Sequence, residues 1–150
     1  MTESSETVTS RETLERLLAE ARQSWLAAPP DLRQRREDLR ALKAAVNTRR
    51  GELIAAMDAD FGHRGEPDSL LGDLLLIGEE IDHALAHLRA WTRRRPVPVN
   101  WKFQPATAWV EYHPVGVVGI ISPWNYPINL ALIPLISALA AGNHALLKPS

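Results

Sequence analysis

Residues 112–150 decide the fold: they read YHPVGVVGIISPWNYPINLALIPLISALAAGNHALLKPS, and no Asp, Glu, Lys or Arg lies between Glu111 and Lys148. Residues 115–121 are a β-branched apolar run of strand length, residues 122–127 are rich in turn formers, and residues 128–141 have the length of a helix. Gly142 and Asn143 end that helix, and residues 145–147 form a second short apolar strand. The pattern predicts a strand–helix–strand unit.

An uncharged stretch of this length could instead cross a bilayer as one helix. Against a membrane span stand Pro114, Pro123, Pro127 and Pro134, because lipid cannot satisfy the backbone groups that such breaks release. We therefore favour a parallel α/β sheet, whose strands are apolar on both faces and joined by a right-handed crossover. Ligands of such sheets bind beyond the carboxyl ends of the strands, so residues 122–126 and 148–150 are the candidate ligand loops.

The chain upstream has the apolar periodicity of helices, with start and stop signals between them. We expect a first helix to begin at a capping box formed by Thr9 and Glu12, and a second to be capped by Asp31. A third helix is expected to begin at Thr48 and to end at Gly62. Residues 1–9 are polar and acidic, which is typical of a flexible tail.

One long helix is expected from Pro67 to residue 95, where three arginines suit the negative end of its dipole better than they suit a phosphate-binding patch. Residues 99–112 combine strand-prone aromatics with Pro105, which indicates one or two short strands or an extended arm. The expected organisation is a tail at 1–9, a helical part at 10–96, an arm at 97–113 and the strand–helix–strand unit at 114–150.

Composition excludes several classes of protein. The 150 residues are 45% hydrophobic and 23% charged, with 17 Lys+Arg, 18 Asp+Glu and no cysteine. A chain of this kind is globular, and without cysteine it has no disulfide, no thiolate metal site and no thiol nucleophile. Its net charge of -1 argues against nucleic acid and acidic lipid as partners, and its opening residues lack signal-peptide features, so we expect a cytoplasmic location.

Histidines give no metal site by their spacing. His83 and His87 are four residues apart on the long helix, but no third ligand accompanies them, so we interpret the pair as part of a solvated face.

The sequence from Tyr112 to Ser150 resembles the aldehyde dehydrogenase superfamily. The resemblance lies in the Pro-Trp-Asn-Tyr-Pro turn after an apolar strand, the Pro-containing helix that ends in Ala-Gly-Asn, and the Lys-Pro-Ser at the end of the next strand. It implies N-terminal helices followed by the first β-α-β unit of a Rossmann-like sheet. Asp60-Phe61-Gly62-His63-Arg64 and the arginine-rich segment resemble the coniferyl aldehyde dehydrogenase branch.

The same resemblance implies a chemistry. Members of the family oxidise aldehydes to carboxylic acids: a cysteine thiolate adds to the carbonyl, a hydride passes to NAD or NADP, and water activated by a glutamate hydrolyses the thioester. They act on small-molecule aldehydes, and the complete enzyme is expected to be a homo-oligomer. Aromatic hydroxycinnamyl aldehydes are the substrates that the branch suggests, with aliphatic aldehydes next, and the choice between NAD and NADP stays open.

Two residues carry the main roles that the resemblance assigns. Asn125 matches the asparagine whose side-chain amide donates a hydrogen bond to the aldehyde oxygen as that oxygen becomes negatively charged. Without the resemblance, an amide that bonds its own turn between two prolines would be the simpler interpretation. Lys148 matches the lysine that contacts the adenosine ribose of the cofactor, and its alternative is a solvated lysine that closes an apolar strand.

The remaining candidates border the cofactor. The resemblance implies that Ile121, Ser122, Pro123 and Trp124 line the cofactor and the neighbouring substrate channel, and that Ser150 belongs to the same cofactor-binding edge. Trp124 could equally be core packing, and for Ile121 we expect the backbone to make the contact.

The parts that complete this chemistry lie further along the chain in the family, including the nucleophilic cysteine and the glutamate base. Lys-Pro-Ser is normally followed by a ribose-binding glutamate, so we expect these 150 residues to be the N-terminal part of a longer enzyme, without its catalytic domain. Alone they are expected to aggregate or stay partly molten, and to catalyse no aldehyde oxidation. The alternative is a truncated paralogue that acts as a non-catalytic binding or assembly partner of a full-length subunit.

Overall fold

The computed structural model describes residues 9–150, and its last third is the predicted β-α-β unit. Strand β3 (Val117–Ile121), helix α6 (Asn129–Ala141) and strand β4 (His144–Lys148) follow one another, and the two strands pair in parallel. The register runs from Val117 opposite His144 to Ile121 opposite Lys148. The predicted fold class, N-terminal helices followed by a first Rossmann-like unit, is therefore confirmed.

Helix α6 ends where the sequence predicts, because Gly142 adopts the left-handed conformation with φ of 86°. Arg35 packs against this helix end, and the space that a Cβ on Gly142 would need is filled by its guanidinium. Asn143 then fixes the return of the chain: its Oδ1 accepts from the Gly116 backbone N–H at 2.9 Å. Both contacts hold the junction between α6 and β4.

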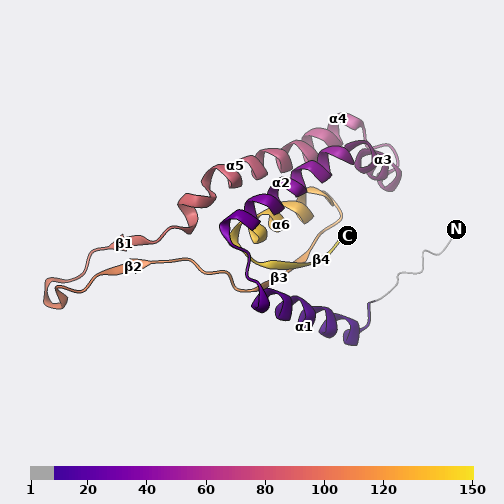
Figure 1. The fold of residues 1–150 in the computed structure, drawn as a ribbon. Helices are drawn as coiled ribbons and strands as arrows, with labels where there is room; N and C mark the ends of the chain where they lie inside the picture. Colours follow the sequence, from indigo (N-terminus) through magenta and orange to yellow (C-terminus); the bar gives the residue numbers. More distant parts are fainter. Residues whose placement is uncertain (1–8) are drawn as a thin grey trace.

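Two layers of helices sandwich the strand pair (Figure 1). On one side, α2 (Leu32–Thr48) and α5 (Leu75–Thr92) pack on α6. On the other side, α1 (Arg11–Ala27) covers β3 and β4, where the Trp25 Nε1–H donates to the Gly142 carbonyl at 2.8 Å. The core lies between α2, α5 and α6, and its buried side chains are Leu39, Val46, Leu74, Ile77, Ile81, Ala84, Leu88, Ile136 and Ala140.

The expected long helix is present and contains one wide turn. It starts as α4 (Glu66–Ser69), widens into a π-helical segment η1 (Leu70–Leu74), and continues as α5. Helix α3 (Arg50–Phe61) precedes it and ends at Gly62, as predicted. The three segments follow one another without a gap, so one long helix runs from Pro67 as predicted, although it ends at Thr92 rather than at residue 95. The wide turn η1 is its irregular part, and Asp73 within η1 is buried.

The arm is a two-stranded hairpin that projects from the helical layer (Figure 1). Strand β1 (Arg95–Val97) pairs antiparallel with β2 (Ala108–Val110), and a short 3-10 turn η2 (Trp101–Phe103) lies between them. The arginines expected in the last helical turn belong to this arm instead. Arg94 Nε lies 2.8 Å from a Glu111 carboxylate oxygen and its guanidinium stacks over Trp109, because helix α5 already ends at Thr92.

Two of the three predicted caps are wrong. Ser10, rather than Thr9, caps α1: its Oγ accepts from the Thr13 N–H at 3.1 Å, so the helix starts one residue later than the Thr9 box requires. Asp31 caps α2 as predicted, with Oδ1 2.7 Å from the Gln34 N. Thr48 caps nothing, since α2 runs through it and α3 begins without a side-chain cap. Except for Thr9, the expected tail lies outside the described residues.

Candidate active site

The carboxyl ends of β3 and β4 lie side by side. Ile121, the last residue of β3, is the register partner of Lys148, the last residue of β4. The chain beyond β3 stays attached to β4, since the Ser122 N–H donates to the Lys148 carbonyl oxygen at 3.0 Å. The two loops singled out in the sequence therefore meet at one edge of the sheet.

Three of the candidate cofactor residues are open to solvent at this edge. The Ile121 side chain is 81% exposed, although Ile121 ends an apolar strand. Lys148 and Ser150 are also exposed, and Ser150 lies two residues beyond β4. The edge thus offers an apolar surface beside an ammonium group, which suits a ligand that has both a flat apolar part and hydroxyl or phosphate oxygens.

Ser122 faces inward instead. It is 5% exposed, and its hydroxyl is placed to donate to the Pro127 carbonyl at 3.0 Å and to the Pro123 carbonyl at 3.2 Å. These bonds close the turn between β3 and α6. The side chain of Ser122 is therefore a structural element of the turn, while only its neighbours Ile121 and Pro123 lie at the surface.

Asn125 lies exposed in the middle of this turn. Among residues 9–150, no hydrogen bond engages its side-chain amide, so the interpretation that it bonds its own turn does not describe the structure. Trp124 is 72% exposed, with its ring 6.5 Å from that of Phe61, so it is not core packing either. Both side chains are available to a bound molecule.

A buried ion pair holds the turn against the helical layer, and sequence reasoning missed it. The Asp73 side chain is fully buried; its Oδ1 accepts from the Asn129 N–H at 2.8 Å, and its Oδ2 lies 2.8 Å from Arg64 Nη2. The carboxylate thus caps the amino-terminal end of α6 from another element, where helix dipoles favour negative charge. We call Arg64 and Asp73 together the Arg64–Asp73 clamp.

The sequence holds a signal for this pair. Asp73 lies three residues after Leu70 and four before Ile77, so it falls on the apolar stripe of the long helix. A charged residue on a buried face needs a partner, and Arg64 precedes the same helix. The stripe could have identified the buried carboxylate, although it could not identify which cation meets it.

A pocket of about 450 Å³ opens beside the turn. Arg64 forms part of its wall, with the guanidinium 5.0 Å from the centroid of the Phe61 ring and 5.2 Å from that of Tyr126. Gly72 allows the Tyr126 ring to lie close to η1, because a Cβ at residue 72 would be only 3.1 Å from Tyr126 Cε1. The complete lining is Phe61, Arg64, Asp68, Leu71, Gly72, Asn125 and Tyr126.

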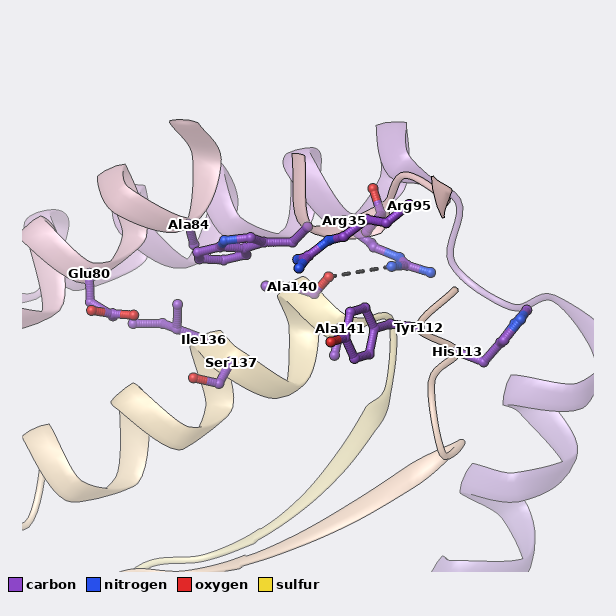
Figure 2. A pocket seen from close by; sticks show the side chains of 12 residues that line it. Arg35, Glu80, Ala84, Arg95, Tyr112, His113, Ile136, Ser137, Ala140 and Ala141 are labelled. Carbon is purple, nitrogen blue, oxygen red and sulfur yellow. Dashed lines mark hydrogen bonds between the residues drawn. The ribbon is translucent and has the colours of Figure 1, made fainter. Parts of the chain in front are cut away.

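A second pocket, of about 440 Å³, lies at the base of the arm between α5 and α6 (Figure 2). It lies at the end of α6 that is remote from Asn125, and none of the site residues predicted from the sequence lines it. Arg35 forms one wall, where its Nη1–H donates to the Ala140 carbonyl at 3.4 Å. Burial lowers the pKa of Arg35 below its ordinary value, and the Asp31 carboxylate opposes that shift.

The described residues hold no group of three or more potential metal ligands. The rings of His83 and His87 lie tilted to each other with centroids 4.2 Å apart, and His87 Nδ1 lies 2.8 Å from the His83 carbonyl oxygen. The His87 ring also stacks on Trp91, so the pair forms an aromatic ladder on the exposed face of α5. Among residues 9–150, no helix combines the length and hydropathy that crossing a membrane requires.

The profile of the aldehyde dehydrogenase family matches residues 7–150. This chain belongs to the aldehyde dehydrogenase family. Its sequence is 41% identical over 138 residues to a Pseudomonas aeruginosa protein named "Probable coniferyl aldehyde dehydrogenase", and the match covers 91% of this chain and 29% of that protein. This chain thus spans about three tenths of the length of that relative.

Solved structures agree with the family fold. The substrate-bound state of Staphylococcus aureus AldH matches with a TM-score of 0.87 and 27% identity, over 91% of this chain and 30% of that chain. The glyceraldehyde-3-phosphate dehydrogenase GapN from Methanocaldococcus jannaschii, complexed with NADP, matches with a TM-score of 0.79 and 21% identity, over 95% of this chain and 30% of that one. At that identity the second match concerns the fold alone.

Proposed function

We propose that these residues are the N-terminal part of an NAD- or NADP-dependent aldehyde dehydrogenase that converts aldehydes to carboxylic acids. The observation that carries the proposal is the exposed turn after β3. It presents the unpartnered amide of Asn125 next to the strand edge where Ile121 and Lys148 are paired. The proposal assigns the donor for a reacting oxygen to Asn125 and two cofactor contacts to Ile121 and Lys148.

Asn125 is proposed to donate a hydrogen bond from its side-chain amide to the aldehyde oxygen as negative charge develops there. A neutral donor suits this role, because it stabilises the charge of the transition state without holding a charged ligand permanently. The amide needs a fixed position, and Pro123 and Pro127 restrict the backbone on both sides of it. One such donor is worth about 3 kcal/mol.

Lys148, Ile121, Pro123 and Trp124 are proposed to hold the cofactor. Their chemistry fits: the ammonium can donate to ribose hydroxyls, and the exposed apolar side chains can cover a flat ring. A bound NAD or NADP supplies the group that accepts a hydride. Ser122 supports this edge through its turn hydrogen bonds, and Ser150 lies at the same edge.

The substrate class is proposed from the relative. A Pseudomonas aeruginosa protein of similar sequence is named for coniferyl aldehyde, an aromatic substrate, and the pocket beside Asn125 is lined by Phe61 and Tyr126. Aromatic aldehydes are therefore our first choice, with aliphatic aldehydes next. A homo-oligomer and a cytoplasmic location are part of the same proposal, and the first of them rests on the family resemblance.

The test is the Asn125→Ala substitution in the full-length protein that carries these residues. We expect kcat for aldehyde oxidation, followed as NAD(P)H absorbance, to fall about 100- to 1000-fold. Arg33→Ala is the matched control, since Arg33 pairs only with Glu37 on the exposed face of α2. Unchanged turnover in Asn125→Ala would remove the asparagine from the mechanism.

A second candidate function is a non-catalytic assembly partner, and the arm favours it. Trp101 is 77% exposed, Phe103 66% and Trp109 50%, which is unusual for large aromatics on one short hairpin. Since the chain has no cysteine, it has no thiol that could attack an aldehyde. Co-purification of the 150-residue chain with a full-length aldehyde dehydrogenase supports the partner role, and its failure to bind one excludes it.

A further inference from the structure

We propose that Arg64 and Asp73 are positioning residues for Asn125, which they hold at the helical layer in the orientation that a reacting carbonyl requires. This inference rests on the proposed function of Asn125. The two side chains lie between the turn and the helical layer. Neither of them takes part in the reaction itself.

The Arg64 guanidinium reaches the turn in two ways. Its Nη1 lies 3.5 Å from the Asn125 carbonyl oxygen, so it contacts the main chain of the residue that it is proposed to hold. Its plane also lies over Tyr126, the next residue. With a side chain only 11% exposed, Arg64 has little freedom to leave these contacts.

Asp73 fixes Arg64 and the start of α6 together. One carboxylate oxygen lies 2.8 Å from Arg64 Nη2, and the other accepts from the Asn129 N–H at 2.8 Å. The Asn129 side chain adds a third link, since its Nδ2 donates to the Gly72 carbonyl at 2.9 Å. The helical layer is therefore linked to the middle of the turn, through Arg64 at Asn125, and to the start of α6, through Asp73 at Asn129.

The Arg64–Asp73 clamp matters for the Asn125 amide, because this donor has no other support. The Asn125 amide is exposed, and no group among residues 9–150 hydrogen-bonds it. Transition-state stabilisation depends on donors whose positions are set before the reaction, and a displacement of about 1 Å can cost about 100-fold in rate. Loosening the clamp should therefore lower kcat while the amide itself remains present.

The experiment compares two variants at Arg64 in the full-length protein. Arg64→Met keeps the length and loses the charge; we expect kcat to fall about 10- to 100-fold, with the aldehyde KM within about threefold of wild type. Arg64→Lys restores a positive charge opposite Asp73, and we therefore expect it to restore the melting temperature. It lacks the planar fork that reaches both Asn125 and Asp73, so we expect kcat to stay low.

Lys43→Met is the matched control. It breaks an ion pair between α2 and α5, Lys43 to Asp82 at 2.6 Å, that has no contact with the turn, and we expect wild-type kcat. Wild-type kcat in Arg64→Met would overturn the proposal. So would a kcat that follows the melting temperature and recovers fully in Arg64→Lys, because the pair would then serve only stability.

Amide hydrogen exchange supplies a readout that is independent of activity. We expect the Asn129 amide to exchange faster in Arg64→Met, while the amides of β4 keep their wild-type rates. The Asn129 amide could exchange faster in Arg64→Met while the full-length protein oxidises no aldehyde. That combination would overturn the proposed function and leave the Arg64–Asp73 clamp intact. An unchanged exchange rate of the Asn129 amide in Arg64→Met would show that the Arg64–Asp73 clamp does not hold this part of the chain.

Discussion

Replacing Gly142 by alanine tests the junction between α6 and β4. Gly142 has φ of 86°, and a Cβ on it would overlap the guanidinium of Arg35. The methyl group would therefore displace Arg35 from two carbonyl oxygens, that of Pro30 at 3.0 Å and that of Ala140 at 3.4 Å. The substitution thus combines a backbone cost with the loss of a side-chain contact.

The two costs can be estimated separately. Alanine in the left-handed conformation costs about 1–2 kcal/mol relative to glycine. Loss of the Arg35 hydrogen bonds adds about 1–2 kcal/mol. We expect Gly142→Ala to lower the free energy of unfolding by about 2–4 kcal/mol, which lowers the apparent melting temperature of the full-length protein by several degrees.

A double-mutant cycle separates the terms, with stability measured by scanning fluorimetry and denaturant unfolding. In an Arg35→Ala background the methyl group meets no guanidinium, so Gly142→Ala should cost only the backbone term of about 1–2 kcal/mol. Gly78→Ala is the control: a Cβ there has no neighbour within 4 Å, and we expect a gain of up to about 1 kcal/mol in helix α5. Equal costs for Gly142→Ala in both backgrounds would refute the reasoning.

Four further outcomes are expected. Lys148→Met should raise the KM of the full-length protein for NAD or NADP about tenfold with kcat nearly unchanged, measured by steady-state kinetics, because one charged donor is lost. Ser122→Ala should lower the melting temperature and leave that KM unchanged, since its hydroxyl is engaged by Pro127. Gly72→Ala should destabilise by about 1 kcal/mol in denaturant unfolding, as its Cβ would crowd Tyr126. The 150-residue chain alone should form no NAD(P)H from any aldehyde, because it has no cysteine.

The β-α-β unit could be predicted because its signals are local. A β-branched run makes β3, and Gly142 stops α6 at the position where its left-handed backbone is needed. Parallel pairing then follows from the apolar faces and the length of the crossover, and this brings Ile121 opposite Lys148. The meeting of the two loops at one strand edge was therefore predictable, whereas the register that sets Ile121 opposite Lys148 was not predicted and comes from the structure.

The errors arise where neighbouring residues compete or where partners are distant in sequence. Thr9 and Ser10 can both cap a helix, and the structure shows that Ser10 does so. Arg94 was assigned to the end of a helix, although the arm that returns beside it offers Glu111 and an aromatic ring. In the Arg64–Asp73 clamp, the position of Asp73 on the apolar stripe could indicate a buried carboxylate, but its partners depend on the placement of α6 and of Arg64, which has no signature in local spacing.

The π-helical turn η1 makes one part of this chain unusually sensitive to changes in length. Helical residues advance by about 100° each, so removing Leu74, which follows Asp73, would turn Asp73 by about that angle relative to α5. The carboxylate of Asp73 would then swing away from Asn129, and the start of the crossover helix would lose its external acceptor. A deletion scan of this region should tolerate gaps in the arm tip at residues 98–106 and reject the removal of Leu74.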